Sequence, residues 1–297
     1  MPKIISGTEI SKVMREEIAS RVSELSRKGI TPGLGVILAG DNPASHIYVR
    51  MKEKACGAVG IYTAIQRFSA DVSQKTIVDL VNKYNNDEKI HGILIQHPLP
   101  DGIDESYVFS QVDPVKDVDG FHPVNEGKLL IGEEGFVSCT PLGILEMLHR
   151  SDYSPEGKHV VIVGRSTIVG KPLAALLMQK NKRANATVTV CHSRTADLRA
   201  ITRTADILVA AIGVPEFITA DMVKKGVVVI DVGTNRVEDS TTEKGGYRLV
   251  GDVKFDEVKE IAEAISPVPG GVGPMTITML LHNTTLSAEK TAEKLQN

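Results

Sequence analysis

Apolar residues recur every three or four positions over residues 6–28, a period typical of an amphipathic helix. Gly29 follows the last of them and predicts the end of that helix. Three short apolar runs come next, GLGVILA at 33–39, IYTAIQRF at 61–68 and KIHGILIQ at 89–96, and they predict strands. Helical patterns stand between them, one opening near Pro43 and one at Ser73. This alternation predicts parallel strands joined by right-handed crossovers.

The same alternation returns in the second half of the chain. Apolar runs at 159–163, 186–191, 206–212 and 226–232 predict strands, with helices near 169–180 and 196–204. We therefore expect an α/β protein with two domains, the second of them a doubly wound, Rossmann-type domain. Residues 101–140 are rich in turn formers and are interpreted as a linker region, followed by a helix that opens at Cys139. A last helical pattern covers 277–295.

Composition limits the partners of the protein. The 34 basic and 37 acidic residues give a net charge of −3, which provides no general attraction for nucleic acid or an anionic membrane. No window approaches the roughly 20 apolar residues of a membrane span, and the first residues lack the apolar core of a secretory signal. Cys56, Cys139 and Cys191 form no CxxC pair, and the histidines form no HExxH set, so no metal site is expected. A reduced, cytoplasmic setting fits these features.

A glycine turn joins the strand HVVIVG to the helical segment that follows it. Gly164 and Gly170 are present, but the middle glycine of G-x-G-x-x-G is missing, and Arg165 and Ser166 follow Gly164 directly. The turn is therefore either a phosphate-binding loop or a purely structural element.

The next strand favours a nucleotide site that prefers NADP. It ends in His192, Ser193 and Arg194, where an NAD enzyme would place an acidic residue against the ribose hydroxyls. An acidic side chain would repel a 2′-phosphate, whereas the side chains of Arg165, Ser166, Ser193 and Arg194 can donate hydrogen bonds to it. We predict NADP as the cofactor.

Tyr48 and Lys52 are four residues apart on a predicted helix, so both side chains leave the same face and their polar ends can meet. An isolated YxxxK is more often a solvated lysine beside a half-buried tyrosine. Here the helix starts at the carboxyl edge of a parallel sheet, where ligand sites form, and the strand ending in Gln96 reaches the same edge. We expect Gln96 to lie near Lys52, which can donate and accept a proton. Short-chain dehydrogenases also carry YxxxK, but in those enzymes the glycine motif comes before YxxxK. In this chain the order is reversed, which excludes that class.

Two further segments are rich in turn residues. The loop DPVKDVDGFHP contains Asp113, Asp117 and Asp119, whose spacing does not match an EF-hand. Its carboxylates are either solvated turn residues or ligand contacts. In PVPGGVGPMT at 267–276, glycines and prolines fix an irregular backbone that a planar ligand can approach closely, and the proline bond at 267 or 269 is a candidate for the cis form.

Nine segments spread over almost the whole chain resemble the family of bifunctional methylenetetrahydrofolate dehydrogenase/methenyltetrahydrofolate cyclohydrolases. They are YVRMKEKACGAVGI, QHPLP, KDVDGFHP, CTP, VIVGRSTIVGKP, TVTVCHSRT, VIDVGTNR, GDV and PVPGGVGPMT. The resemblance implies two α/β domains with a cleft between them and a homodimer. Residues 1–120 would form the folate-binding catalytic domain, with a C-terminal helix at 275–297 packing back on it. Residues 121–274 would form the NADP domain, including a linker helix at 140–150.

The resemblance also assigns residues to roles. Lys52 is similar to the catalytic lysine of the family, Tyr48 to its positioning partner and Gln96 to the residue that tunes the lysine. Asp119 would anchor the pterin ring, and the remaining folate contacts would be Pro98, Val268, Pro269, Gly270 and Gly271. The cofactor positions would be Gly164, Arg165, Ser166, Ser193, Arg194 and Thr234.

The activity implied is NADP-dependent oxidation of 5,10-methylenetetrahydrofolate, followed by hydrolysis of the methenyl product to 10-formyltetrahydrofolate. Lys52 would move protons in the hydrolysis. Two alternatives stay open. One is another NADP-dependent two-domain dehydrogenase, similar to shikimate dehydrogenase, and the other is a folate-binding protein without catalysis.

Overall fold

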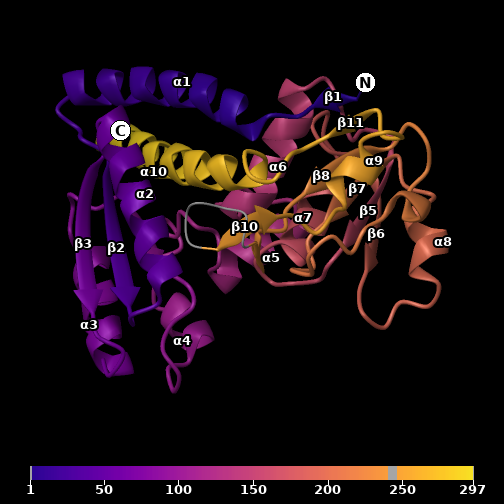
Figure 1. The fold of residues 1–297 in the computed structure, drawn as a ribbon. Helices are drawn as coiled ribbons and strands as arrows, with labels where there is room; N and C mark the ends of the chain where they lie inside the picture. The colour runs from indigo at the N-terminus through magenta and orange to yellow at the C-terminus, as the bar shows by residue number, and fades with distance from the viewer. Residues whose placement is uncertain (1, 240–245, 297) are drawn as a thin grey trace. The chain divides into compact units, whose positions relative to one another are not determined.

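The computed structural model describes residues 2–239 and 246–296, which form two compact units. The three-stranded unit consists of residues 12–139 and 277–296, and the six-stranded unit of residues 2–11 and 140–276. Each is named after its main sheet, and in both sheets all strands run parallel. Helices accompany both sheets (Figure 1). The predicted α/β class with two domains is confirmed.

The sheet of the three-stranded unit has the order β3-β2-β4, with β2 at Gly33–Ala39, β3 at Tyr62–Phe68 and β4 at Gly92–Ile95. All of β2 is buried, as its continuous apolar sequence requires, whereas β3 at the edge is largely open to solvent. Helix α2 (Pro43–Val59) connects β2 to β3, and α3 (Gln74–Asn85) connects β3 to β4. The predicted crossovers are therefore present.

Residues 101–140 were interpreted as a linker, and that interpretation was wrong. They contain the helices α4 (Glu105–Phe109) and α5 (Pro123–Ile131), and the boundary of the compact unit falls at 139/140. The sequence rules missed α5 because His122 caps it: the imidazole Nδ1 accepts a hydrogen bond from Val124 N at 3.0 Å. The usual capping residues are Ser, Thr, Asp and Asn.

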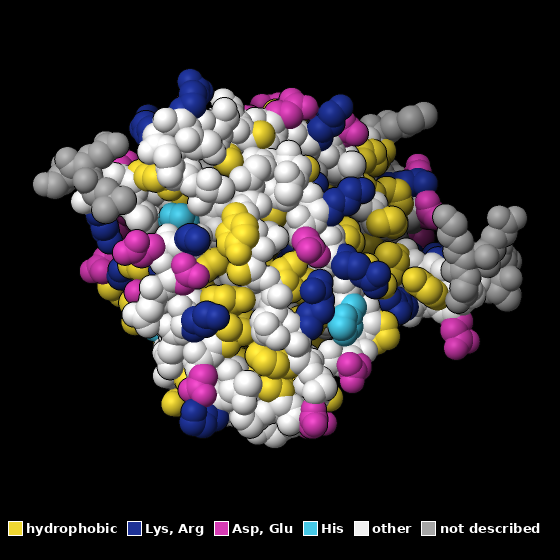
Figure 2. Space-filling view, turned by 90° about the vertical axis from the view of Figure 1, so that its left-hand side faces the viewer, with side chains coloured by type: hydrophobic (Ala, Val, Ile, Leu, Met, Phe, Trp, Pro, Cys, Tyr) yellow, Lys and Arg dark blue, Asp and Glu magenta, His cyan; other side chains and the backbone are white. Residues whose placement is uncertain are grey.

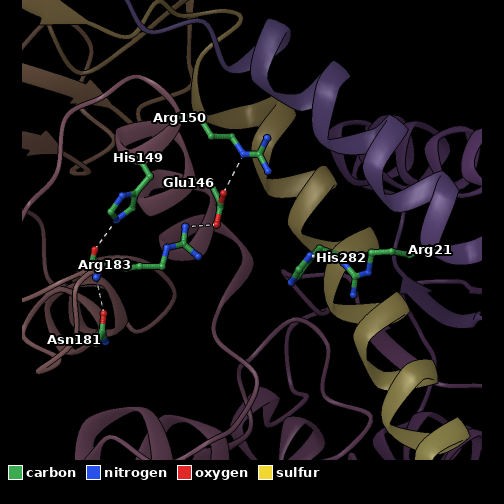
Figure 3. Close-up of polar contacts among 7 residues, drawn as sticks. All are labelled: Arg21, Glu146, His149, Arg150, Asn181, Arg183 and His282. Carbon is green, nitrogen blue, oxygen red and sulfur yellow. Dashed lines mark hydrogen bonds and ion pairs between the residues drawn. The ribbon is translucent and has the colours of Figure 1, made fainter.

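Two long helices are shared between the units. Helix α1 (Gly7–Arg27) leaves the six-stranded unit after Ser11, and α10 (Val272–Gln296) enters the three-stranded unit at Ile277. Within the three-stranded unit α1 and α10 lie side by side (Figure 1). Arg21 of α1 makes a bidentate ion pair with Glu289 of α10. Its guanidinium also contacts His282 Nδ1 at 3.0 Å, and Figure 3 shows the Arg21 and His282 side chains next to each other.

The six-stranded sheet has the order β1-β11-β8-β7-β5-β6. Its strands are β1 (Lys3–Ile4), β5 (His159–Val163), β6 (Thr187–Cys191), β7 (Ile207–Ala210), β8 (Val228–Asp231) and β11 (Ala264–Ile265). The neighbouring elements are α6 (Cys139–Arg150), α7 (Gly170–Leu177), α8 (Leu198–Thr202), α9 (Phe255–Val258) and the 3₁₀ turn Ala220–Met222. A hairpin of β9 (Asn235–Glu238) and β10 (Tyr247–Val250) is added to them.

Ion pairs secure α6 within this unit. Glu146 accepts hydrogen bonds from Arg150, one turn later, and from Arg183 in the segment before β6 (Figure 3). His149 contacts the carbonyl of Arg183 at 2.7 Å. Within the described ranges, no helix contains the long apolar stretch that crossing a bilayer requires.

Candidate active site

A hydrogen bond joins Lys52 to Gln96. The Nζ atom of Lys52 donates to Oε1 of Gln96 at 3.0 Å, and both side chains are half-buried. Gln96 directly follows β4, and its backbone N–H donates to the carbonyl of Ile37 in β2 at 2.9 Å. The predicted approach of Gln96 to Lys52 is confirmed, because two neighbouring parallel strands end at one edge of the sheet.

Helix α2 is fixed at both ends, which orients Lys52. Its N-cap is Asn42, whose side chain accepts hydrogen bonds from Ala44 N and Ser45 N, and Pro43 occupies the first helical position. Gly60 ends the helix in the left-handed conformation, with φ 85°. Tyr48 lies one turn before Lys52 and is 40% exposed. Across the described residues no hydrogen bond joins the two, so this helix face presents a tyrosine hydroxyl and an ammonium separately.

The QHPLP loop after β4 is held by Glu105. The carboxylate of Glu105 contacts Nδ1 of His97 at 2.9 Å and accepts a hydrogen bond from Leu99 N at 2.6 Å. The His97–Pro98 peptide bond is cis, and Pro98 is exposed. Gln96 is tied to the same loop, because its Nε2 donates to the carbonyl of His97 at 2.8 Å. The loop therefore fixes the group that accepts from Lys52.

Asp119 completes this cluster in the three-stranded unit. Burial raises the pKa of its carboxyl group, while the charge of Lys52, a hydrogen bond from Cys139 and the charge of His97 act in the opposite direction. The Cys139 thiol is buried, and burial together with the nearby Asp119 raises its pKa well above the ordinary value. Lys52 and Gln96 are thus in direct contact, and the carboxyl group of Asp119 is close enough to Lys52 to interact with it electrostatically.

The other two aspartates of the loop are turn-formers. Asp117 is buried and accepts hydrogen bonds from Phe121 N, His122 N and the amide of Asn125. Burial raises the pKa of Asp117 to about 6. Asp113 accepts from Val115 N at 3.0 Å. Among the described residues, no group of three or more His, Cys, Asp or Glu side chains is arranged to hold a metal ion.

The segment Val268–Gly271 lies in the six-stranded unit and is held against the start of α1. The Val268–Pro269 bond is cis, whereas the bond before Pro267 is not, which decides the alternative left open by the sequence. Thr8 N donates to the carbonyl of Gly270 at 3.0 Å. A Cβ atom at Gly271 would lie 2.5 Å from the carbonyl oxygen of Pro267. The glycine is therefore required by the folded loop itself.

The turn between β5 and α7 is packed closely around its two glycines. A Cβ atom at Gly164 would lie 2.1 Å from the carbonyl oxygen of Ala211, and one at Gly170 would lie 2.2 Å from that of Gly164. Gly164 has φ 134°, and Arg165 and Ser166 after it are exposed. At the amino end of α7 the Ser166 hydroxyl accepts hydrogen bonds from Val169 N at 3.2 Å and Gly170 N at 3.4 Å, so Ser166 caps the end of the helix that favours an anion.

Ser193 and Arg194 are exposed at the end of β6, the neighbour of β5 in the sheet. The His192 side chain accepts from Arg194 N at 3.1 Å, and His192 N donates to Thr195 Oγ1 at 2.8 Å, so a tight turn presents Ser193 and Arg194 outward. Thr234 is exposed after β8. All these positions follow the carboxyl ends of strands in the six-stranded sheet, the edge where α/β domains bind nucleotides.

Two family models match the chain. Residues 5–119 match the tetrahydrofolate dehydrogenase/cyclohydrolase catalytic domain, and residues 138–292 match the NAD(P)-binding domain of the same family.

The chain belongs to the tetrahydrofolate dehydrogenase/cyclohydrolase family.

Relatives in this family match over nearly their whole length. The bifunctional protein FolD of Chlorobium chlorochromatii is 52% identical over 290 residues, 97% of this chain and 98% of the relative. The crystal structure of FolD from Campylobacter jejuni has a TM-score of 0.92 and 44% identity, and the match covers 98% of this chain and 100% of that one. The Trypanosoma brucei enzyme, solved with NADP cofactor and an inhibitor, has a TM-score of 0.91, 40% identity and coverage of 98% and 99%.

The first alternative predicted from the sequence has only a similarity of fold. Shikimate 5-dehydrogenase from Thermus thermophilus has a TM-score of 0.51 and 14% identity, covering 86% of this chain and 99% of that one. The family resemblance found in the sequence is therefore confirmed, and the relationship to shikimate dehydrogenases does not extend beyond architecture.

Sequence reasoning missed two buried aspartates that organise loops of the six-stranded unit. Asp231 accepts hydrogen bonds from Gly233 N, after β8, and from Asp252 N and Val253 N, after β10, while Asp252 accepts from Ile212 N and Gly213 N, after β7. A single signal was available: Asp231 directly follows an apolar run in VVVID, and Asp252 follows one after a single glycine in RLVGD. Buried charges need such partners, so acidic residues in these positions indicate loops organised around a carboxylate.

Proposed function

We propose that this chain oxidises 5,10-methylenetetrahydrofolate with NADP and then hydrolyses the methenyl product to 10-formyltetrahydrofolate. The observation that carries the proposal is the contact of Lys52 with Gln96 beside the half-buried Asp119. A lysine held by an amide, next to a carboxyl group and with a tyrosine one turn away, can bind a pterin and move protons near it. The family assignment supports this reading.

In the oxidation, the protein mainly positions the substrate. NADP, when bound, accepts a hydride, and the nitrogen lone pairs beside the one-carbon bridge stabilise the cation that forms. No protein base is needed for that step, so alignment supplies most of the rate. Asp119 anchors the pterin ring, and Tyr48, Pro98 and the segment Val268–Gly271 contact the folate.

In the hydrolysis, Lys52 moves protons. Water that adds to the methenyl carbon must lose a proton, and a ring nitrogen must gain one before the carbon–nitrogen bond breaks. The Nζ atom of Lys52 serves both transfers when it enters the step as the neutral amine: it accepts the first proton and, as the ammonium, then donates a proton to the ring nitrogen. Gln96 keeps the ammonium aimed at one position through its Oε1, which is itself fixed by the loop that Glu105 holds.

NADP is held by the six-stranded unit. The residues that bind it are Gly164, Arg165, Ser166, Ser193, Arg194 and Thr234. The closely packed turn at Gly164, with the exposed Arg165 and Ser166, takes the pyrophosphate, and Ser193 and Arg194, exposed after β6, take the 2′-phosphate. The preference for NADP over NAD follows, since no acidic side chain stands at the end of β6 to hold a free ribose hydroxyl.

The protein forms a homodimer through the edge of β3. Tyr62 N donates to the carbonyl of Pro32, and the carbonyl of Phe68 accepts from Gly40 N, so both ends of β3 bond toward the β2 side. Because backbone groups alternate in direction along a strand, those of Thr63, Ile65 and Arg67 point away from β2, toward the open edge. Figure 2 views the side of the three-stranded unit that carries β3, where hydrophobic side chains show among charged ones. A second copy can pair with this edge about a twofold axis, which would also cover it from other chains.

The dimer is tested by sedimentation velocity on Ile65→Pro and Ile65→Val. Proline removes the outward N–H, whereas valine retains it. We expect the proline variant to sediment as a monomer with an unchanged circular dichroism spectrum and the valine variant to remain dimeric. If both variants remain dimeric, the edge of β3 is not the dimer interface. The three buried thiols that form no disulfide support a reducing, cytoplasmic setting for the protein.

A coupled assay tests the proposed function. Purified protein is mixed with 5,10-methylenetetrahydrofolate and either NADP or NAD, and the absorbances of reduced nucleotide and of methenyl product are followed together. We expect reduced nucleotide to form with NADP, and added methenyltetrahydrofolate to be consumed without nucleotide. Turnover of shikimate, or folate binding with no turnover, would refute the proposal and favour one of the two alternatives.

A further inference from the structure

One amide from α10 holds the segment that contains Asp119. The side chain of Asn283 is 2% exposed, and its Nδ2 donates to the carbonyl of Val118 at 2.9 Å and to that of Val137 at 3.1 Å. Val118 directly precedes Asp119. A residue 165 positions away in the sequence therefore fixes the peptide that carries the proposed pterin anchor.

The backbone on the other side of Asp119 is fixed as well. The hydroxyl of Ser138 donates to the carbonyl of Gly120 at 3.0 Å. Gly120 has φ 76°, and a Cβ atom there would lie 2.4 Å from Ser138 N, so the two segments are in close contact. Cys139 adds a bond from its thiol to the carbonyl of Val118 at 3.4 Å. Both carbonyls that flank Asp119 thus have buried donors.

The amide of Asn283 and the hydroxyl of Ser138 contact the main chain and leave the carboxylate of Asp119 to other groups. The groups that act on that carboxylate are Lys52, Cys139 and His97. If the donor of Asn283 is removed, the carbonyl of Val118 keeps only the long bond of 3.4 Å from the Cys139 thiol and the carbonyl of Val137 loses its buried amide donor, so the backbone at 118 is held less firmly. The direction of the Asp119 side chain then changes even though no atom that touches the ligand has been replaced.

We infer that Asn283 is a positioning residue for folate binding, acting through Val118 on Asp119. The inference rests on the proposed role of Asp119 as the pterin anchor. Helix α10, which returns the chain to the three-stranded unit, would then contribute to substrate recognition as well as to the packing of the core.

The test compares Asn283→Leu with Thr284→Val in the full-length protein. Leucine has a similar size but no donor. Thr284 is the next residue of α10, equally buried, and its hydroxyl donates to the carbonyl of Leu280 within the same helix. Its replacement removes a buried hydrogen bond without touching Val118. We expect the KM for the folate substrate to rise about tenfold in Asn283→Leu, in both reactions, with the KM for NADP unchanged. Thr284→Val should leave the folate KM of both reactions and the KM for NADP unchanged.

A double variant separates positioning from a loss of stability. Asn283→Leu added to Asp119→Ala should raise the folate KM no further than Asp119→Ala alone, because the group that it positions is gone. A further rise of about tenfold in that background, or equal effects of Asn283→Leu and Thr284→Val, would overturn the inference.

Amide hydrogen exchange distinguishes this inference from the function proposed for Asp119. We expect exchange at residues 118–120 to be faster in Asn283→Leu and unchanged in Thr284→Val. If Asp119→Ala alone leaves the folate KM unchanged, the anchor role of Asp119 is refuted and the link to folate binding falls with it. If instead Asp119→Ala raises the KM while Asn283→Leu alters neither exchange nor KM, only the positioning role is refuted.

Discussion

Lys52 and Gln96, 44 positions apart, are joined by a hydrogen bond of 3.0 Å from Nζ to Oε1. Gln96 is immobilised in turn by the loop that follows it, through its own bond to the carbonyl of His97. The Nζ atom of Lys52 therefore has one preferred direction before any substrate arrives, which is the preorganisation that proton transfer needs.

Replacing Lys52 should separate the two reactions. Lys52→Met removes the amine, and we expect hydrolysis of methenyltetrahydrofolate to fall by at least about 100-fold, since general acid–base catalysis typically contributes this much. The dehydrogenase rate should fall far less, because hydride loss needs no protein base. Lys54→Met is the control, as Lys54 is exposed two residues further along α2. Hydrolysis at the wild-type rate in Lys52→Met would remove lysine from the mechanism.

The carboxylate of Glu105 should matter although it lies outside the proposed contacts. Glu105→Ala removes the acceptor of Leu99 N and the partner of His97. We expect kcat for hydrolysis to fall about tenfold as the loop that holds Gln96 loosens. Glu88→Ala, an exposed carboxylate before β4, serves as the matched variant in stopped-flow measurements. Equal rates in both variants would show that Glu105 does not affect Gln96.

Gly164→Ala should abolish NADP binding. The added methyl group would meet the carbonyl of Ala211 at 2.1 Å, and alanine disfavours φ 134°. Gly157 also has a positive φ, 70°, but no atom lies within 4 Å of its Cβ position, so Gly157→Ala measures the cost of the backbone angle alone. Isothermal titration with NADP should show binding in Gly157→Ala and none in Gly164→Ala. Equal affinity in the two variants would argue against the turn as the phosphate site.

An acidic residue after β6 should reverse the cofactor preference. Ser193→Asp places a carboxylate where the 2′-phosphate is proposed to bind, and we expect kcat/KM with NADP to fall about 100-fold while that with NAD changes little. Ser154→Asp adds the same charge in the loop before β5, at the opposite edge of the sheet. Steady-state assays with both nucleotides measure the ratio. A proportional loss with NADP and NAD would mean that Ser193 does not contact the phosphate.

The buried Asp231 should make stability fall as pH rises. Burial raises its pKa from 3.8 to about 7, so the folded state holds a proton that the unfolded chain releases over this range. The free energy of unfolding should therefore decrease between about pH 4 and pH 7, by at most about 4 kcal/mol at 1.36 kcal/mol per pKa unit. In urea titrations, Asp231→Asn should show a flatter pH dependence over this window.

Asp206 provides a control of opposite sign. A hydrogen bond from Lys224 lowers the pKa of its carboxyl group, so its contribution to stability is present above the unfolded pKa and is lost as the pH falls below it. Asp206→Asn should therefore leave the slope between pH 5 and pH 7 unchanged. If Asp231→Asn keeps the wild-type slope, the carboxyl of Asp231 does not titrate in that range.

Local patterns predicted the parts of the site that depend on neighbouring strands. Gln96 could be placed near Lys52 because both follow strands with continuous apolar sequences, and parallel strands end at one edge. The fold class followed from the same patterns. The start of α10 was predicted five residues late, because Val272, Gly273 and Pro274 resemble a loop, although proline is tolerated in the first turn of a helix.

Long-range polar contacts could not be predicted in this way. Asn283 lies in an apolar helical pattern, and nothing near it indicates carbonyl partners at Val118 and Val137. The position of Asp231 after an apolar run indicates a buried carboxylate, but it does not identify Gly233, Asp252 and Val253 as the residues whose N–H groups donate to it. Such partners are determined by tertiary packing, which the local periodicity of apolar residues does not predict.

The return of α10 to the three-stranded unit has a consequence for biosynthesis. Ser287 in this helix donates to the carbonyls of His91 and Val115, and Asn283 donates to those of Val118 and Val137. Segments that are synthesised early therefore have hydrogen-bond donors that are synthesised late. A ribosome releases the polypeptide from its amino end, and residues 277–296 emerge only after the entire six-stranded unit. The proposed catalytic unit is thus the last to be completed, and a nascent chain stalled before residue 277 leaves these carbonyls without their native donors.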